Sequence, residues 1–277
     1  MSMRVSVTGL NASQAELSTI ANNIANASTT GFKASRVQFA DLFAGDASRA
    51  TPGSGVRVAS VTQMFKQGGM DVTGNNLDMA INGRGFFATT GSDGRFDYTR
   101  AGNFRLNAAG DIVSDQGSKV MFFARKDDGT FNETAGGLVS IKGNVPLRVP
   151  RADDATKVDV YPVTRLEIDP VGVVRASYSN GSTAELGKVA LANFASPTDL
   201  SQQGNNNWRP TLESGEPTFA AAAKGDRGQL EVGALEASNV DIAEQLVQMI
   251  TAQRNFQANA KSITTFDAIA QAVINIR

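Results

Sequence analysis

Apolar residues recur every seven positions at both ends of this chain. Near the N-terminus the row consists of Met3, Leu10, Leu17 and Ile24. Near the C-terminus the row consists of Ile242, Met249, Phe256 and Ile263, with Leu246, Ala260 and Ile274 beside it. A seven-residue spacing aligns side chains along one side of a helix and is typical of coiled-coil packing. The pattern predicts two terminal helices that pack against each other or against other copies of the chain.

Both helices carry boundary signals. The first is expected over Met3–Ala27, within an assembly segment 1–31 that Gly31 terminates. It is rich in asparagine, a poor helix former, so we expect it to be frayed in the free monomer and to order on assembly. The second is expected within 236–277, with Ser238 or Asn239 as N-cap. Its length of about 55 Å suggests more than one neighbour.

The region between the helices has the signature of β-structure. Residues 32–70 lack a clear period and indicate an extended connector with one hairpin, whereas 71–235 indicate a β domain. Turn dipeptides such as Asn180–Gly181 separate its apolar stretches, and Pro197–Lys224 is polar and is expected to be mainly loop. Strands are expected at 120–124, 166–168, 173–177, 188–194 and 229–232. The fold class is therefore α+β, with a coiled-coil-like helix pair and a mainly antiparallel β domain.

Composition removes several classes of function. The chain has no cysteine and no histidine, which excludes thiolate metal sites and every Ser-His or Cys-His arrangement. We therefore expect no enzyme activity, no cofactor and no metal site. A net charge of −1 argues against binding of nucleic acid. No apolar run is long enough to insert in a membrane, and no cleavable secretory signal follows Arg4.

Two local motifs have both a chemical and a plain interpretation. Gly83–Ala88 matches the dinucleotide fingerprint, but a turn sequence follows it in place of a helix, so a tight β-turn is favoured. Trp208 stands among Asn205, Asn206 and Asn207 and could form a ligand platform, although packing or a subunit contact is favoured. The apolar rows also have a plain interpretation, namely an ordinary helical hairpin within one chain.

The stretch Ile20–Lys33 (IANNIANASTTGFK) is similar to the N-terminal signature of the flagellar rod and hook proteins, the bacterial axial family. The further matching stretches are Leu77–Phe87, Tyr98–Phe104, Gly233–Asp241 and Glu244–Asn259. They occur in the family's order and lie at both ends and in the interior of the chain. The resemblance implies a helical, tubular polymer with the terminal helices on its inner wall and the β domains outside.

Within the family, some stretches are most similar to hook proteins. These are Phe39–Phe43, Leu191–Ala195 and Gln203–Trp208. Hook proteins usually contain a further β domain, which would be inserted near 145–166, where this chain is short. The alternatives are a naturally minimal hook protein, a hook protein lacking its outer domain, and a distal rod protein, which is normally about this size. The connector after Phe43 lacks the longer insertion expected of the distal rod protein, so the hook is favoured.

The resemblance also implies partners and a location. It implies contacts with copies of the same chain, with neighbouring rod and hook–filament junction proteins and with the flagellar export apparatus. It places the chain in the extracellular flagellum, exported without a cleaved signal. The predicted assembly interface consists of Leu10, Leu17, Ile20, Ile24, Ile242, Leu246, Met249, Phe256, Ile263 and Ile274. A rival of another class is a β-domain binding module with a helical stalk, whose contact would be Trp208.

Overall fold

A computed structural model describes residues 2–42, 53–91, 93–126, 128–150 and 158–275. Residues 43–52 of the expected connector, Phe43 among them, and residues 151–157 of the expected insertion point at 145–166 are therefore outside the described residues. The chain divides into two compact units. Residues up to 28, 33–66 and those from 239 onward form one unit, here called the helical unit. Residues 29–32 and 67–238 form the other, here called the β domain.

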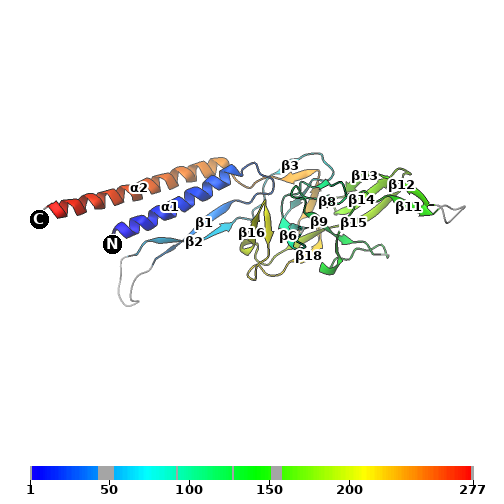
Figure 1. The fold of residues 1–277 in the computed structure, drawn as a ribbon, viewed down its shortest axis with the longest axis horizontal. Coiled ribbons are helices and arrows are strands. Elements are labelled where there is room, and N and C mark those ends of the chain that lie inside the picture. Colours follow the sequence, from blue (N-terminus) through cyan, green and yellow to red (C-terminus); the bar gives the residue numbers. More distant parts are fainter. Residues whose placement is uncertain (1, 43–52, 92, 127, 151–157, 276–277) are drawn as a thin grey trace. The chain divides into compact units, whose positions relative to one another are not determined.

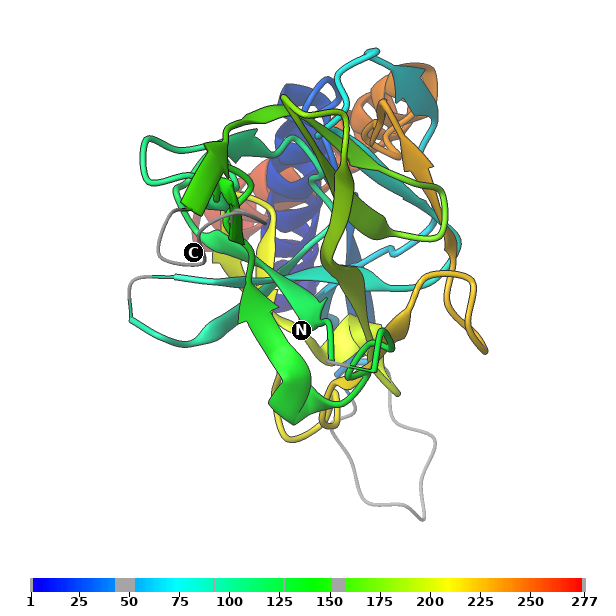
Figure 2. The ribbon, with the colours of Figure 1, turned by 90° about the vertical axis from the view of Figure 1, so that its right-hand side faces the viewer.

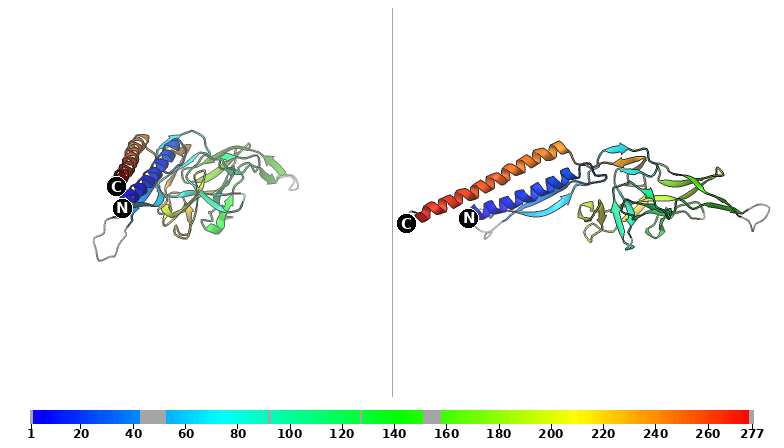
Figure 3. Two further views of the ribbon diagram at one scale, coloured as in Figure 1. Left: turned by 60° about the vertical axis from the view of Figure 1, so that its left-hand side comes forward. Right: turned by 45° about the horizontal axis from the view of Figure 1, so that its top comes forward.

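The helical unit contains both terminal helices and one hairpin. Helix α1 (Ser2–Ala25) and helix α2 (Ile242–Asn275) lie side by side and antiparallel (Figure 1). Strands β1 (Ser35–Asp41) and β2 (Val56–Gln63) form an antiparallel hairpin along α1, visible in both views of Figure 3. The two predicted helices and their mutual packing are confirmed. The expected connector therefore contains a hairpin that belongs to the helical unit.

The N-cap of α2 differs from the prediction. The Oδ1 atom of Asp241 accepts hydrogen bonds from the backbone N–H groups of Ala243 and Glu244, at 2.8 and 3.1 Å. The side chain of Asn239 instead bonds to the backbone next to β1 and β2. Its Oδ1 accepts from the N–H of Ala34, and its Nδ2 donates to the carbonyls of Met64 and Lys66. The expectation of Ser238 or Asn239 as N-cap is wrong, because this tertiary contact uses the Asn239 amide.

The β domain consists of short strands with two single 3₁₀ turns, at Ala135–Gly137 and Pro197–Asp199. Its described strands are β3 (Met70–Val72), β4 (Met79–Asn82), β5 (Phe86–Thr90), β6 (Phe96–Thr99), β7 (Arg105–Leu106), β8 (Ile112–Val113), β9 (Lys119–Ala124), β10 (Leu138–Ser140), β11 (Leu147–Pro150), β12 (Val158–Tyr161), β13 (Val163–Ile168), β14 (Val173–Tyr178), β15 (Thr183–Asn193), β16 (Ser201–Gly204), β17 (Asn207–Arg209), β18 (Thr218–Ala221), β19 (Gln229–Val232) and β20 (Ala234–Glu236).

The described strands pair antiparallel throughout. The main sheet has the order β13-β14-β15-β9-β5-β6-β17-β16, while β4 pairs with β19, β3 with β20 and β11 with β12. Strand β15 is the longest, and it changes partners along its length: its first part pairs with β14 and β9, and its second part with β18 and β5. Because the partners change, the strands wrap around a common interior (Figure 2).

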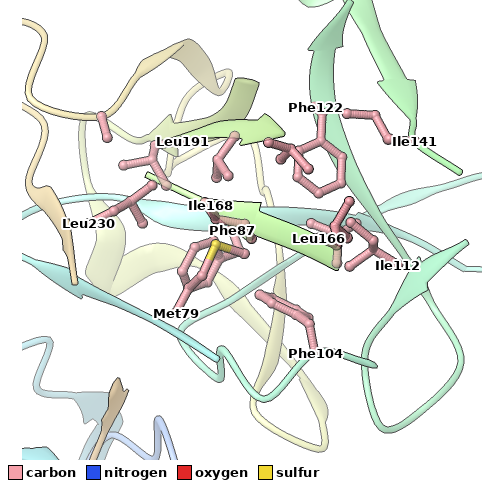
Figure 4. Close-up of a cluster of buried hydrophobic side chains, with 14 of the residues drawn as sticks. Met79, Phe87, Phe104, Ile112, Phe122, Ile141, Leu166, Ile168, Leu191 and Leu230 are labelled. Carbon is pink, nitrogen blue, oxygen red and sulfur yellow. The ribbon is translucent and has the colours of Figure 1, made fainter. Parts of the chain in front are cut away.

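One hydrophobic core fills that interior. Met79 and Ile81 of β4, Phe87 of β5, Phe122 of β9 and Leu191 of β15 are fully buried in it. Figure 4 shows Met79, Phe87, Phe122 and Leu191 within this cluster. The ring of Phe104 meets that of Phe87 edge to face at a centroid distance of 5.2 Å. These contacts explain why apolar stretches between turn dipeptides predicted the strands.

The expected strands are confirmed, and one expected loop is wrong. The region Pro197–Lys224 contains β16, β17 and β18. Every residue of β16 is exposed, so this strand shows no apolar alternation and forms only through backbone pairing with β17. At Gly83–Ala88 the chain turns directly into strand β5, so no helix N-terminus is present there to bind a dinucleotide, as the sequence indicated.

Candidate functional site

The interface between α1 and α2 has a defined antiparallel register. Asn23 of α1 contacts Gln245 of α2 near one end, and Gly9 faces Asn259 further along. In an antiparallel pair the residue numbers of facing residues have a constant sum, and here that sum is 268 for both pairs. The first residues of α1 therefore lie opposite Phe266. A methyl group at Gly9 would lie 2.8 Å from the side-chain amide of Asn259, so the missing side chain at Gly9 makes room for that amide.

The buried side of each helix is only partly apolar. On α1 the buried residues include Ser6, Ala12, Ser13, Ile20 and Asn23. On α2 only Gln245 and Ala252 are buried. Small and polar side chains therefore occupy much of the interface within the chain. This composition differs from the leucine-rich seam of a self-sufficient coiled coil.

The predicted interface residues fall into three groups. Ile20 is buried. The half-buried residues are Leu10, Leu17, Ile24, Met249, Phe256 and Ile263. The exposed residues are Ile242, Leu246 and Ile274. The structure thus brings most of the two rows to the edge of the helix pair and leaves three residues in solvent, and their role in assembly remains a prediction.

A buried polar cluster fixes one end of the helix pair. The Nδ2 atom of Asn23 donates to Gln245 Oε1 and to the carbonyl of Ser35, both at 2.9 Å. The Oδ1 atom of Asn23 accepts from the N–H of Ser35, also at 2.9 Å. One amide therefore joins α1, the start of β1 and the start of α2. The sequence marked Asn23 only as a poor helix former.

Helix α2 carries further apolar residues that are exposed to solvent. Besides Ile242, Leu246 and Ile274, its exposed residues include Val247, Ile250, Ile269 and Val273. After Phe266 every described residue of α2 is exposed, because α1 has no residue opposite that part. No helix in the described residues is long and apolar enough to cross a membrane. The arrangement can bind apolar protein surfaces.

The β domain offers little support for the binding-module alternative. Trp208 is 1% exposed and packs edge to face against Phe86, with 5.7 Å between ring centroids. The plain interpretation of Trp208 is therefore confirmed. Its neighbours Asn205, Asn206 and Asn207 line a polar pocket of about 320 Å³. Among the described residues no group of three or more acidic side chains is placed to hold a metal ion.

A buried ion pair in the β domain joins four of the matching stretches. Arg100 and Glu236 lie 3.2 Å apart, with side chains 5% and 0% exposed. Glu236 Oε1 accepts from the N–H of Gly68, and the carbonyl of Glu236 accepts from the N–H of Gly31. Arg100 Nη2 donates to the carbonyl of Gly83. These four residues of the ion-pair network, Gly31, Gly83, Arg100 and Glu236, come from four different stretches that carry the family resemblance.

The electrostatics of this pair follow from its burial. Burial lowers the pKa of Arg100, and the nearby Glu236 carboxylate partly offsets that shift. The guanidinium also lies 5.2 Å from the centre of the Phe86 ring. Sequence reasoning missed this pair. The available signal was one charged residue within each of two otherwise uncharged stretches: Arg100 within Tyr98–Phe104 and Glu236 within Gly233–Asn239.

Comparisons with known families agree with this geometry. Residues 3–33 match the model described as flagella basal body rod protein, and 231–276 match the C-terminal model of the flagellar basal body rod FlgEFG proteins. Residues 80–176, within the β domain, match the flagellar hook protein FlgE/F/G D1 domain. The matches therefore cover both terminal helices and the part of the domain that contains Arg100.

Individual relatives include both hook and rod proteins. The flagellar hook protein FlgE of Salmonella typhimurium is 28% identical over 407 residues, covering 100% of both chains. The flagellar basal-body rod protein FlgG of Agrobacterium fabrum is 32% identical over 287 residues, covering 98% of this chain and 97% of its own. FlgG of Bacillus subtilis is 33% identical over 285 residues, covering 98% and 97%.

Proposed function

Because the chain belongs to the family of flagellar hook and rod proteins, we propose that it is a structural subunit of the flagellar hook. Copies of the chain assemble through their terminal helices into a helical tube that serves as a flexible joint for motility. The observation that carries this proposal is the set of exposed apolar residues along α2. Its members are Ile242, Leu246, Val247, Ile250, Ile269, Val273 and Ile274.

Exposed apolar side chains on a helix favour association. Fully burying a valine, leucine or isoleucine side chain stabilises by about 1.5–3 kcal/mol relative to leaving it in water. Several such residues on one helix therefore provide a large driving force for contact with other copies. A head-to-tail contact that does not close repeats indefinitely and produces a helical filament. The subunit has a structural role and no catalytic one in this proposal.

The proposed partners follow from a position of the chain in the flagellar tube. The chain contacts other copies of itself within the tube and meets neighbouring rod and hook–filament junction proteins at the two ends. It reaches the extracellular flagellum through the flagellar export apparatus without a cleaved signal peptide. The β domains provide the lateral contacts on the outside of the tube.

Two observations support hook over rod. Stretches such as Leu191–Ala195 and Gln203–Trp208 are most similar to hook proteins. In addition, strands β11 and β12 form an antiparallel pair in which Pro150 lies opposite Val158. The chain therefore leaves and re-enters the domain at adjacent points. A further domain can be inserted at such a site without disturbing the strands around it.

Chain length favours the distal rod as a second candidate. The alignment with the hook protein FlgE spans 407 positions, and this chain has 277 residues, so at least 130 positions have no counterpart here. The alignments with the rod proteins span 285 and 287 positions and need no such gap. Electron microscopy of assembled material separates the two candidates: a curved, supercoiled tube supports the hook, and a straight rigid one supports the rod.

The assembly role is tested by introducing charge into the helix rows. We expect Leu17→Asp and Met249→Asp to abolish polymerisation while the β domain stays folded, as reported by the fluorescence of buried Trp208. The matched control is Val171→Asp, which places the same charge on an exposed apolar residue of the β domain. Normal filaments from both helix variants would contradict the assignment of the interface.

Circular dichroism tests whether the helices fold on assembly. We expect the dilute monomer to show less helix than the 24 and 34 residues of α1 and α2 would give, with a rise on polymerisation. A fully helical monomer at micromolar concentration would contradict coupled folding. It would leave the proposed polymer intact, because preformed helices can also associate.

A further inference from the structure

Helix α2 carries the same exposed apolar arrangement twice. The first set, here called the head triplet, is Ile242, Leu246 and Val247. The second set, the tail triplet, is Ile269, Val273 and Ile274. Each residue of the tail triplet follows its counterpart by 27 positions. All six side chains are exposed, from 46% for Leu246 to 72% for Ile274.

A separation of 27 residues has a specific meaning on a helix. At 3.6 residues per turn it corresponds to about 7.5 turns, so each tail residue points to the side opposite its head counterpart. At 1.5 Å per residue it corresponds to a distance of about 40 Å along the axis. Consider a copy of α2 moved by about 40 Å along its axis, toward its N-terminus, and sideways by one helix diameter. Its tail triplet then faces the head triplet of the original helix.

The rest of the helical unit leaves both triplets uncovered. The register of α1 and α2 ends near Phe266, so the tail triplet lies beyond the last residues that α1 can cover (Figure 3). The head triplet is next in sequence to Gln245, which is buried and contacts α1. Its own three side chains point to other sides of the helix and are exposed. Both are exposed in the chain by itself.

The charge distribution permits this contact. The last turns of α2, from Phe266 to Asn275, carry one charged residue, Asp267. The head triplet is flanked by Glu244, which hydrogen-bonds within its own helix to Gln248 at 3.0 Å. Glu244 and Val273 are 29 residues apart, about eight turns, so they point to the same side and Glu244 faces away from an incoming tail. The contact is therefore between apolar sides.

We propose that the tail triplet of one copy packs on the head triplet of the next copy. The two α2 helices lie parallel and are offset by about 40 Å along their axes. The row Ile269–Val273 of one copy lies against the row Ile242–Leu246 of the next. The contact uses two different surfaces, so it repeats without closing and generates a continuous strand of copies. This inference rests on the proposed function, since it names the surfaces through which the polymer grows.

Cysteine cross-linking tests the contact directly, because the natural chain has no cysteine. In the double variant Leu246→Cys/Val273→Cys the two thiols of one copy are about 40 Å apart, far beyond the reach of a disulfide. Any disulfide between them joins two copies. After assembly and mild oxidation we expect a ladder of covalent dimers, trimers and longer species on a non-reducing gel.

The matched control is Glu244→Cys/Val273→Cys, which moves one thiol by two residues to the far side of the same turn. We expect at least a tenfold weaker ladder from it. Filaments of the test variant without a ladder, or equal ladders from both variants, would overturn the head-to-tail contact. The single variants Leu246→Cys and Val273→Cys show under reducing conditions whether each substitution permits assembly.

The wild-type polymer provides a second measurement that needs no variant. We expect image reconstruction of wild-type filaments to show α2 helices of contacting copies offset by about 40 Å, with the two triplets in contact. An offset that differs by more than about two turns, or 11 Å, would overturn the proposal while leaving the proposed function standing. A wild-type chain that forms no polymer would instead overturn the proposed function.

Discussion

The substitution Glu236→Ala is expected to destabilise the β domain strongly. It removes the carboxylate that lies 3.2 Å from Arg100, while the guanidinium stays in a site where the side chain is 5% exposed. It also removes the acceptor for the N–H of Gly68, 3.0 Å away. Arg100 Nε has no hydrogen-bond partner among the described residues, so the contacts left to the cation include the Gly83 carbonyl and the Phe86 ring.

The magnitude follows from the cost of a buried, unpaired charge. Removing one partner of a buried ion pair typically costs about 3–5 kcal/mol. The whole domain is expected to be stable by about 5–15 kcal/mol, so the variant loses a large fraction of that. The double variant Arg100→Met/Glu236→Leu removes both charges and should be less destabilised than Glu236→Ala, because no charge is left without a partner.

Urea denaturation followed by tryptophan fluorescence measures this loss. Trp208 is the single tryptophan of the chain and is buried beside Phe86, which Arg100 contacts, so its emission reports on unfolding of this domain. With an m-value of about 2 kcal/mol per molar urea, a loss of about 4 kcal/mol lowers the midpoint by about 2 M. A shift below about 0.5 M, or a double variant less stable than Glu236→Ala, would refute the reasoning.

Three further predictions concern other contacts. Gly102→Ala should destabilise the β domain by about 3 kcal/mol or more, measured by the same urea titration, because a methyl group there would lie 1.6 Å from the Met79 carbonyl oxygen. Asn23→Ala should cost the helical unit about 1–3 kcal/mol by leaving buried partners such as Gln245 unsatisfied, and faster hydrogen exchange at the start of β1 would detect this. Burial raises the pKa of Tyr98, so the unfolded chain releases that proton first above about pH 10, and stability should fall as pH rises from there. Tyr98→Phe should flatten this alkaline decline in thermal unfolding curves, and an unchanged slope would argue against it.

Much of the architecture could be predicted from local patterns. Seven-residue spacing predicted both terminal helices, and apolar stretches between turn signals predicted strands such as β14 and β19. Strand β16 could not be predicted, because all four of its residues are exposed and only backbone pairing with β17 defines it. Backbone hydrogen bonds leave no mark on side-chain composition.

The identity of the interface residues was predictable only in part. Heptad spacing selected Leu10 and Leu17, which the structure leaves half-buried, while the small and polar Ser6 and Ser13 are buried on α1. Which side of a helix faces a neighbour depends on how the two surfaces fit together. Gly9 makes room for the side-chain amide of Asn259, and apolar spacing alone does not contain this information.

By itself, the sequence determined the helices at both ends, the β domain between them and the family, because these depend on periodicity and on local stretches of residues. Only the tertiary structure decided that Asn239 bonds to the strands and leaves the α2 cap to Asp241. It likewise brought Arg100 and Glu236, 136 positions apart, into one buried pair. Such contacts depend on long-range packing. A polar side chain has several possible partners, and only the folded chain decides which of them lies next to it.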